Sequence, residues 1–276
     1  MKPITGSSRP MRLAITRGVS PAIGDCELTF LEREPIDVGA ARAQHRAYER
    51  VLEGLGCRVS RLEEDGDFPD SVFVEDIAVV LDEVAVITRP GAESRRGERD
   101  AIEAALSPHR VVERIEAPGI LDGGDVLVVG RSVYVGLSTR SNAEAADQLR
   151  GIVSQHGYSV SEVEVGGCLH LKSAATALSE DSLLINPEWV DPGSFQGLDC
   201  VHVDPSEPEA ANVVRVGDAV LFSAAFPRTG GRLSSLGLDA RPVDASELAK
   251  AEGALTCCSL IFEVARVEGL IGDSPA

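Results

Sequence analysis

The chain has 276 residues, of which 43% are hydrophobic and 25% charged, and its formal net charge is −18. Its length fits one large domain or two of ordinary size, and its composition is that of a soluble globular protein. The acidic balance argues against nucleic acid and anionic membrane surfaces as partners, because both repel acidic proteins, and no apolar run reaches the roughly 18 residues of a membrane span.

The N-terminal segment and the cysteines bear on the compartment. "MKPITGSSRPMRLAI" carries basic residues but no apolar core of a signal peptide, so we expect no secretory signal. The six cysteines contain no CxxC pair and no framework spacing, which predicts reduced thiols in a cytoplasmic protein. The acidic charge would suit a cationic substrate, although a solubilising surface is the simpler explanation.

In chain order, the first predicted elements are a strand, a loop and a helix. "MRLAITRG" (11–18) is the strand, and the Gly and Pro residues of "RGVSPAIGDCELTF" (17–30) predict a loop that can close as a lid. Residues 37–56 place apolar side chains at helical spacing and end at Gly56, a suitable helix terminator.

Four hairpins follow, each joining two apolar, β-rich runs across a short turn. They span residues 75–91, 123–139, 170–188 and 210–226. Two more helices are expected among them. One covers residues 141–157, with a Ser/Asn cap and a terminal glycine, and the other covers residues 244–255, where Asp244 and Glu247 match a capping box. The last strand, "CCSLIFEV", begins at Cys257.

A repeated spacing connects these elements. Asp76, Asp125, His170, Asn212 and Cys257 stand at the head of successive units, 49, 45, 42 and 45 residues apart. A period near 45 with one hairpin per unit is typical of a radial repeat, and the helices make it an α/β array. The first and last strands are expected to pair and complete a fifth unit of one domain (1–276). Equivalent positions, including Glu75 and Asp122, then meet at the axis.

Cys257 and Cys258 have several possible roles. An isolated buried cysteine is usually core filler, and adjacent cysteines that point to opposite faces of a strand are poor zinc ligands. The repeat position of Cys257, beside acids and a histidine, favours a reactive thiol. Cys258 is then expected to face into packing.

The other candidate residues are a histidine, acids and arginines. His170 begins its strand and can act as general acid or base, because an imidazole titrates near neutrality. Asp122 in "LDGGDV" can orient that imidazole or bind a cation, and the two glycines suggest a backbone that makes room for a neighbour. Paired carboxylates in "PDSVFVED" suit a planar guanidinium. Arg95 and Arg140, in loops after hairpins, can bind a carboxylate.

Six of these segments, "PDSVFVEDIAVV", "ITRPGAESRR", "LDGGDVL", "VGLSTRSN", "LHLKS" and "LTCCS", together resemble the dimethylarginine dimethylaminohydrolases. They occur in matching order, and the resemblance runs from about residue 13 to residue 262. It implies an α/β fold of the pentein type, a five-fold pseudosymmetric β/α-propeller of ββαβ-type units. It also implies hydrolysis of Nω-methylated L-arginine to citrulline and a methylamine, without cofactor or metal.

The same resemblance implies residue roles. Cys257 matches the nucleophile that attacks the guanidinium carbon, His170 the general acid and base, and Asp122 the acid that contacts this histidine. The implied substrate-binding residues are three acids, two arginines that grip the α-carboxylate, and two positions that contact the substrate backbone: Asp70, Glu75, Asp76, Arg95, Arg140, Leu28 and Ala251.

Other functions stay open at this level. Arginine deiminases resemble the chain in the FxxED and GGD regions, but they carry His-x-Asp where this sequence has Lys172 two residues after His170. The alternatives are therefore a deiminase-like hydrolase of another small guanidine, or a non-catalytic guanidine-binding or scaffold relative. A small guanidine is the expected partner, and the oligomeric state is open, with a homodimer as one option.

Overall fold

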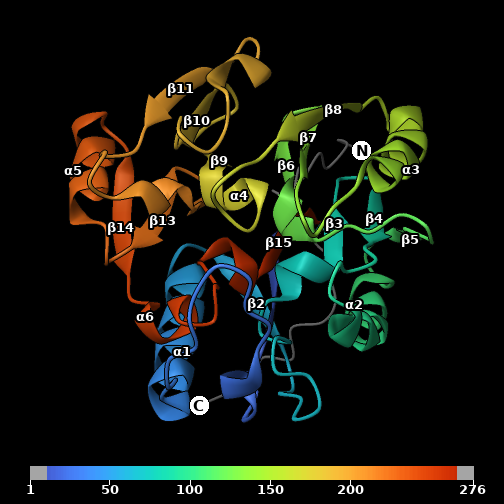
Figure 1. Cartoon of the computed structure of the whole chain (residues 1–276), viewed down its shortest axis with the longest axis horizontal. Helices are drawn as coiled ribbons and strands as arrows, with labels where there is room; N and C mark the ends of the chain where they lie inside the picture. The colour runs from blue at the N-terminus through green and yellow to red at the C-terminus, as the bar shows by residue number, and fades with distance from the viewer. Residues whose placement is uncertain (1–10, 266–276) are drawn as a thin grey trace, which may run out of the picture.

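The computed structural model describes residues 11–265. The ends of the predicted domain, residues 1–10 and 266–276, lie outside the described residues, and so does most of the segment considered as a secretory signal. Five three-stranded sheets stand around a central axis (Figure 1). In each sheet an antiparallel pair of strands is extended by a parallel third strand, which confirms the predicted β/α-propeller.

The sheets follow the chain in order, with their strands numbered along the sequence. Their members are β3 (Ala78–Val80), β4 (Val84–Ile87) and β5 (Val111–Arg114); β6 (Val126–Val129), β7 (Ser132–Leu137) and β8 (Ser159–Glu164); β9 (Ala175–Ala177), β10 (Ser182–Ile185) and β11 (Asp199–His202); β12 (Val213–Val216), β13 (Ala219–Ser223) and β14 (Asp239–Val243); and β15 (Leu260–Val264), β1 (Met11–Arg17) and β2 (Cys57–Leu62).

The fifth sheet joins strands from distant parts of the chain. β1 pairs antiparallel with β15, from Met11 opposite Val264 to Ile15 opposite Leu260. β2 lies parallel to β1 on its other side. The strand that follows Cys257 is therefore held by the strand that opens the described chain.

Helices make most of the crossovers to the parallel strands, as such connections require. They are α1 (Val38–Gly54), α2 (Arg99–Leu106), α3 (Ala143–Val153) and α5 (Pro227–Ser235). The third unit differs, because β10 and β11 are joined by a loop that contains only the 3-10 turn Pro192–Ser194.

The helix predictions were partly right. α3 is capped by Asn142, whose side chain accepts the N–H of Ala145, and the chain leaves the helical region through Gly157 at φ 81°. α1 ends at Gly54, two residues before the predicted terminator Gly56.

The predicted helix 244–255 was wrong in extent. It is reduced to α6 (Ser246–Ala249), and the chain cannot continue it to residue 255 because Glu252 has a left-handed backbone, with φ 56°. Glu247 does not close the expected capping box, since its carboxylate binds Lys250 and the N–H of Asp37. Helices α2 and α5 were not predicted.

A short helical turn precedes the inner strand of every unit, where the sequence had suggested extended chain. The turns are Val74–Ile77, Gly123–Asp125, α4 (Leu171–Ala174), Pro208–Ala211 and Thr256–Cys258. Consecutive side chains on a helical turn project in different directions around it, whereas those on a strand alternate between two faces. The side chains of neighbours such as Glu75 and Asp76 can therefore point to different sides of the turn that carries them.

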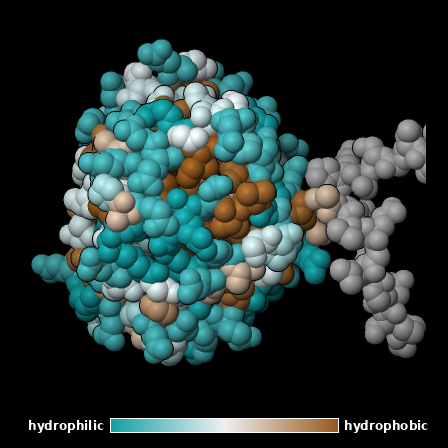
Figure 2. All heavy atoms as spheres, turned by 90° about the vertical axis from the view of Figure 1, so that its right-hand side faces the viewer, coloured by the Kyte–Doolittle hydropathy of each residue, from teal (hydrophilic) through white to brown (hydrophobic). Residues whose placement is uncertain are grey.

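The face of the molecule drawn in Figure 2 is mostly hydrophilic. Figure 2 faces the side that carries β5, β8, α2 and α3, and shows apolar side chains gathered near its centre. Four large hydrophobic side chains are exposed among residues 11–265: Phe30, Leu31, Val111 and Leu236. Within that range, no helix combines the length and the apolar character needed to cross a membrane.

Candidate active site

The axial residues meet around a small pocket. Its volume is about 20 Å³, room for about one water molecule and too little for a substrate the size of arginine. The pocket is therefore narrow, and a substrate can enter only if part of its wall moves. Its lining includes most of the predicted site: Asp70, Asp76, Arg95, Asp122, Arg140, His170, Ala251 and Cys257.

His170 lies between two buried carboxylates. Its Nε2 is 3.1 Å from Oδ2 of Asp122, and its Nδ1 is 3.9 Å from Oδ1 of Asp76. Burial alone would lower the pKa of the imidazole, but Asp76, Asp122 and the nearby Asp125 raise it to about 9. His170 is consequently an imidazolium at neutral pH and is ready to donate a proton.

Backbone N–H groups bind the carboxylates of Asp122 and Asp125, and the second of these contacts lies next to His170. Oδ1 of Asp122 accepts the N–H of Gly91 at 2.9 Å, and Oδ1 of Asp125 accepts the N–H of Leu171, next to His170, at 2.9 Å. Asp122 is fully buried. Asp122 therefore orients the imidazole at Nε2, while Asp125 fixes the backbone that carries it.

Gly124 explains the glycine pair of "LDGGDV". Its N–H donates to Oδ1 of Asp76 at 3.1 Å, and a Cβ at this position would lie 2.5 Å from Nδ1 of His170. The backbone thus approaches the histidine more closely than any side chain would permit.

Arg95 lines the pocket and is buried, and each of its three guanidinium nitrogens donates a hydrogen bond. Its Nη1 donates to Oδ2 of Asp76 at 2.6 Å, its Nε and Nη2 bind Glu98 at 3.0 and 2.9 Å, and Nη2 also reaches the carbonyls of Asp70 and Phe73. Burial alone would raise the pKa of Asp76, but His170 and Arg95 hold it below its usual value. Asp76 therefore stays ionised beside the pocket.

Cys257 lines the pocket, whereas Cys258 is not part of the described lining. Burial, together with the charges of Asp76 and Glu75, raises the pKa of the Cys257 thiol. Cys258 is 1% exposed and donates to the carbonyl of Ala254 at 3.4 Å. The sequence had predicted both cysteines on a strand, but they lie in the turn Thr256–Cys258. Even so, only Cys257 of the two lines the pocket.

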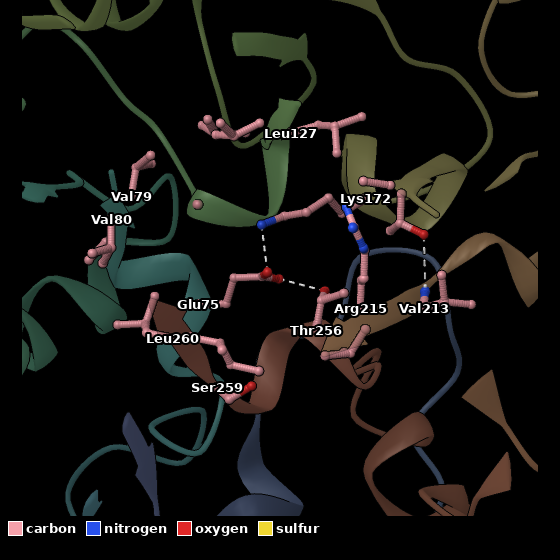
Figure 3. A pocket seen from close by; sticks show the side chains of 18 residues that line it. Glu75, Val79, Val80, Leu127, Lys172, Val213, Arg215, Thr256, Ser259 and Leu260 are labelled. Carbon is pink, nitrogen blue, oxygen red and sulfur yellow. Dashed lines mark hydrogen bonds and ion pairs between the residues drawn. The ribbon is translucent and has the colours of Figure 1, made fainter. Parts of the chain in front are cut away.

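Glu75 lies on the other side of the axial turns from the pocket. Its Oε1 accepts from Nζ of Lys172 at 2.5 Å and its Oε2 from the hydroxyl of Thr256 at 2.6 Å (Figure 3). It lines a second axial cavity, of about 270 Å³, between the inner strands of the five sheets. Glu75 therefore influences the pocket through its negative charge and not through direct contact.

Arg140 and the loop of residues 18–37 cover the pocket. Nη2 of Arg140 donates to Oγ1 of Thr29 at 2.9 Å, and the N–H of Glu27 donates to Oδ2 of Asp70 at 3.1 Å. Leu28 is half-buried and packs against the apolar cluster around Phe73, outside the described pocket lining.

Glu252 fastens this loop. Its carboxylate accepts the N–H groups of Thr29, Phe30 and Leu31 at 3.0, 2.5 and 2.6 Å. Its backbone has φ 56°, a left-handed conformation that is uncommon for a residue with a side chain. The loop that the sequence suggested as a lid is therefore held closed by a residue next to Ala251.

A metal would compete with these contacts. Ligand atoms of Asp76, Asp122 and His170 lie within 4.8 Å of one another. However, both nitrogens of a protonated His170 carry hydrogens, and Arg95 already neutralises Asp76. The three residues form a charge-balanced set with the arginine.

The comparisons with known proteins agree with this geometry. Residues 30–192 match the family model described as N,N dimethylarginine dimethylhydrolase, eukaryotic. The chain is 42% identical over 229 residues to the N(G),N(G)-dimethylarginine dimethylaminohydrolase of Pseudomonas aeruginosa, covering 82% of this chain and 90% of that protein. This chain belongs to the dimethylarginine dimethylaminohydrolase family.

A second member and a solved structure of the first extend the match. The dimethylarginine dimethylaminohydrolase of Streptomyces coelicolor is 40% identical over 253 residues, which cover 91% of this chain and 97% of that one. The Pseudomonas aeruginosa enzyme, solved as a cysteine-to-serine mutant in complex with citrulline, superposes with a TM-score of 0.87 at 38% identity. That match covers 91% of this chain and 99% of the Pseudomonas chain, so the propeller is shared over its whole length.

Some residues of the site were not found from the sequence. Glu98, the second partner of Arg95, stands three positions after it, and this spacing could have suggested the pair. Glu252 gave no signal, because its partners are backbone N–H groups more than 200 residues away. Thr256 was overlooked beside the more conspicuous cysteines.

Proposed function

We propose that this protein hydrolyses Nω-methylated L-arginine to L-citrulline and dimethylamine or methylamine, with Cys257, His170 and Asp122 as its catalytic residues. The carrying observation is that a thiol and an imidazolium held by two carboxylates line one narrow pocket. Membership of the family supports the reaction, and the citrulline held by the Pseudomonas enzyme has the chemistry of its product.

The first half of the reaction breaks the bond to the methylated nitrogen. The guanidinium cation binds beside Asp76, and its charge favours loss of the Cys257 proton to solvent. The thiolate attacks the guanidinium carbon and forms a C–S bond. The C–N bond then breaks, and the departing amine takes the proton of the His170 imidazolium. A thiouronium intermediate remains on Cys257.

The second half releases citrulline. His170, now neutral, takes a proton from a water molecule that attacks the thiouronium carbon. The C–S bond breaks, the proton of the new hydroxyl leaves with the sulfur, and the ureido oxygen of citrulline comes from water. His170 ends the cycle protonated, with Asp122 holding its ring throughout.

The substrate-binding residues have different parts in this scheme. Asp76 and Asp70 face the guanidinium end of the pocket, and Arg140, which is close to the covering loop, would bind the α-carboxylate. Glu75 contributes its negative charge from behind the turn. Arg95 was expected to grip the α-carboxylate, but its guanidinium is already paired with Asp76 and Glu98, so its part here is to fix Asp76. Leu28 and Ala251 would contact the substrate backbone once the loop has moved.

The contacts of Lys172 weigh against a deiminase. In this chain the residue two positions after His170 is a lysine bound to Glu75, on the side of the larger axial cavity (Figure 3). It therefore supplies no carboxylate to hold unmethylated guanidinium nitrogens. A methylated nitrogen therefore meets no carboxylate from this position, and plain arginine would be held more weakly.

Citrulline release from asymmetric dimethylarginine tests the proposal. Wild type and Cys258→Ser should both release citrulline, and Cys257→Ser should release none, since a serine hydroxyl is not ionised in this pocket. An inactive, correctly folded wild type would overturn the proposal. Activity in Cys257→Ser but not in Cys258→Ser would show that the wrong thiol was chosen.

The partner, the compartment, the cofactor and the oligomeric state are part of the same proposal. A small guanidine is the proposed partner, with neither nucleic acid nor a membrane surface, since the chain is strongly acidic. The cytoplasm is the proposed compartment, and no metal or other cofactor takes part. A homodimer is compatible with this scheme, whose catalytic groups all come from one chain.

A further inference from the structure

The turn that carries Cys257 is weakly held by its own backbone. It consists of Thr256, Cys257 and Cys258, and its two backbone hydrogen bonds, from Cys258 to Leu255 and from Ser259 to Thr256, both measure 3.3 Å. Hydrogen bonds in single 3-10 turns are poor in geometry, so such a turn takes its orientation from its surroundings. What holds Thr256 therefore decides where the thiol points.

Asn212 holds the start of this turn. Its Oδ1 accepts the backbone N–H of Thr256 at 3.1 Å, and its Nδ2 donates to Oγ1 of the same residue at 2.9 Å. Nδ2 also donates to the carbonyl of Lys172 at 3.0 Å. An amide is required here, because one end must accept from an N–H while the other donates to two oxygens.

These contacts continue into a chain of hydrogen bonds that ends at two charged side chains. Oγ1 of Thr256 accepts from Asn212 and therefore directs its own hydrogen to Oε2 of Glu75, while Lys172 binds Oε1. Asn212, Thr256 and Glu75 are all buried. Hydrogen bonds linked in this way strengthen one another, and their members move together.

Asn212 also occupies the axial position of the fourth unit, where the other four supply acids, the histidine and the thiol. It has no part in the proposed chemistry and does not line the pocket among the described residues. We propose that Asn212 is a positioning residue for Cys257, which fixes the nucleophile through Thr256 and ties the turn to Glu75 and Lys172. The inference rests on the proposed function for its catalytic consequence but not for its geometry.

The test compares Asn212→Ala with a matched variant, Asn186→Ala. Asn186 is equally buried, and its amide likewise accepts an N–H, that of Glu188 at 3.0 Å, and donates to a carbonyl, that of Pro208 at 3.0 Å. Both substitutions should lower stability similarly, but only Asn212→Ala should disturb the turn.

For Asn212→Ala we expect kcat to fall roughly 10- to 100-fold, the effect of misplacing a reacting group by about 1 Å, while KM stays within about threefold. Alkylation of Cys257 by iodoacetamide, located by peptide mass spectrometry, should become roughly threefold faster or more, because the loosened thiol is more accessible. Asn186→Ala should leave kcat unchanged.

A double-mutant cycle with Thr256→Val completes the test, and the single variant Thr256→Val replaces Asn212→Ala if the latter does not fold. This substitution keeps the N–H and removes the hydroxyl, so it should also lower kcat, and the double variant should be no worse than Asn212→Ala. Multiplying effects, or an Asn212→Ala enzyme with unchanged kcat and unchanged alkylation, would refute the positioning role. Equal losses in Asn186→Ala would refute it too. If the wild type proved inactive on methylarginine, the alkylation rates alone would still decide the geometric part.

Discussion

Gly124 provides a severe perturbation of the site with a small chemical change. The substitution Gly124→Ala would place a methyl group 2.5 Å from Nδ1 of His170 and 2.8 Å from Oδ1 of Asp76, where side-chain carbons do not come closer than 3.0 Å. Ordinary contact begins near 3.4 Å, so the imidazole must shift by about 1 Å and lose the present alignment of its 3.1 Å contact with Asp122. A shift of this size in a proton donor costs about 100-fold in rate.

The expected result is therefore a kcat for methylarginine about 100-fold below wild type, with a stability loss of about 1–3 kcal/mol from overpacking. The pKa of His170, followed by NMR, should fall below about 9 as the ring leaves its carboxylates.

Gly151→Ala is the matched control. It adds the same methyl group within α3, where nothing lies within 4 Å. It should leave kcat unchanged and stabilise the helix by up to about 1 kcal/mol. A folded Gly124→Ala enzyme with kcat within about threefold of wild type would show that the position of His170 is not limiting.

Three other predictions concern charges of the site. Because the pKa of His170 is raised to about 9 from an ordinary value of 6.5, its stabilising effect is complete below pH 6.5 and is lost as pH rises toward 9. The free energy of unfolding in urea should fall by about 2 kcal/mol between pH 6 and 8, and a similar fall in His170→Gln would contradict this. Arg95→Lys should destabilise the fold by about 3 kcal/mol, since it leaves Asp76 poorly paired, whereas Arg140→Lys should mainly raise KM; the reverse pattern would make Arg95 the substrate arginine. Glu252→Gln should weaken the hold on the covering loop and speed tryptic cleavage at Arg33, and unchanged cleavage would mean that the loop is held elsewhere.

The arrangement of the units could be predicted from the sequence, because the hairpins are local. Turns at Gly130 and Gly217 adopt positive φ values of 57° and 62°, which glycine supplies without strain. A constant spacing between chemically unusual residues then indicated which positions face the axis. Both signals depend only on residues close in sequence or on a simple period.

The directions of the axial side chains could not be predicted in the same way. Treating Glu75 and Cys257 as parts of strands gave them only two possible faces, but each lies in a helical turn whose direction is set by partners in other units. Glu75 faces Lys172 and Thr256, which are far from it in sequence. Helix α5 was missed because glycines and serines give it a weak helical pattern, and it forms because Leu233 and its neighbours pack on the sheet of β12–β14.

The pairing of β1 with β15 has a consequence for how the protein folds. Four of the five sheets contain a hairpin whose strands are neighbours in sequence, but the sheet behind Cys257 requires two strands from opposite ends of the described chain. Closing so long a loop costs more entropy than forming a hairpin and is slow. A partly folded chain can thus contain four ordered blades and still have no assembled nucleophile. Closure of the ring brings the thiol to its histidine, so a reactive cysteine is presented only by molecules that have completed their fold.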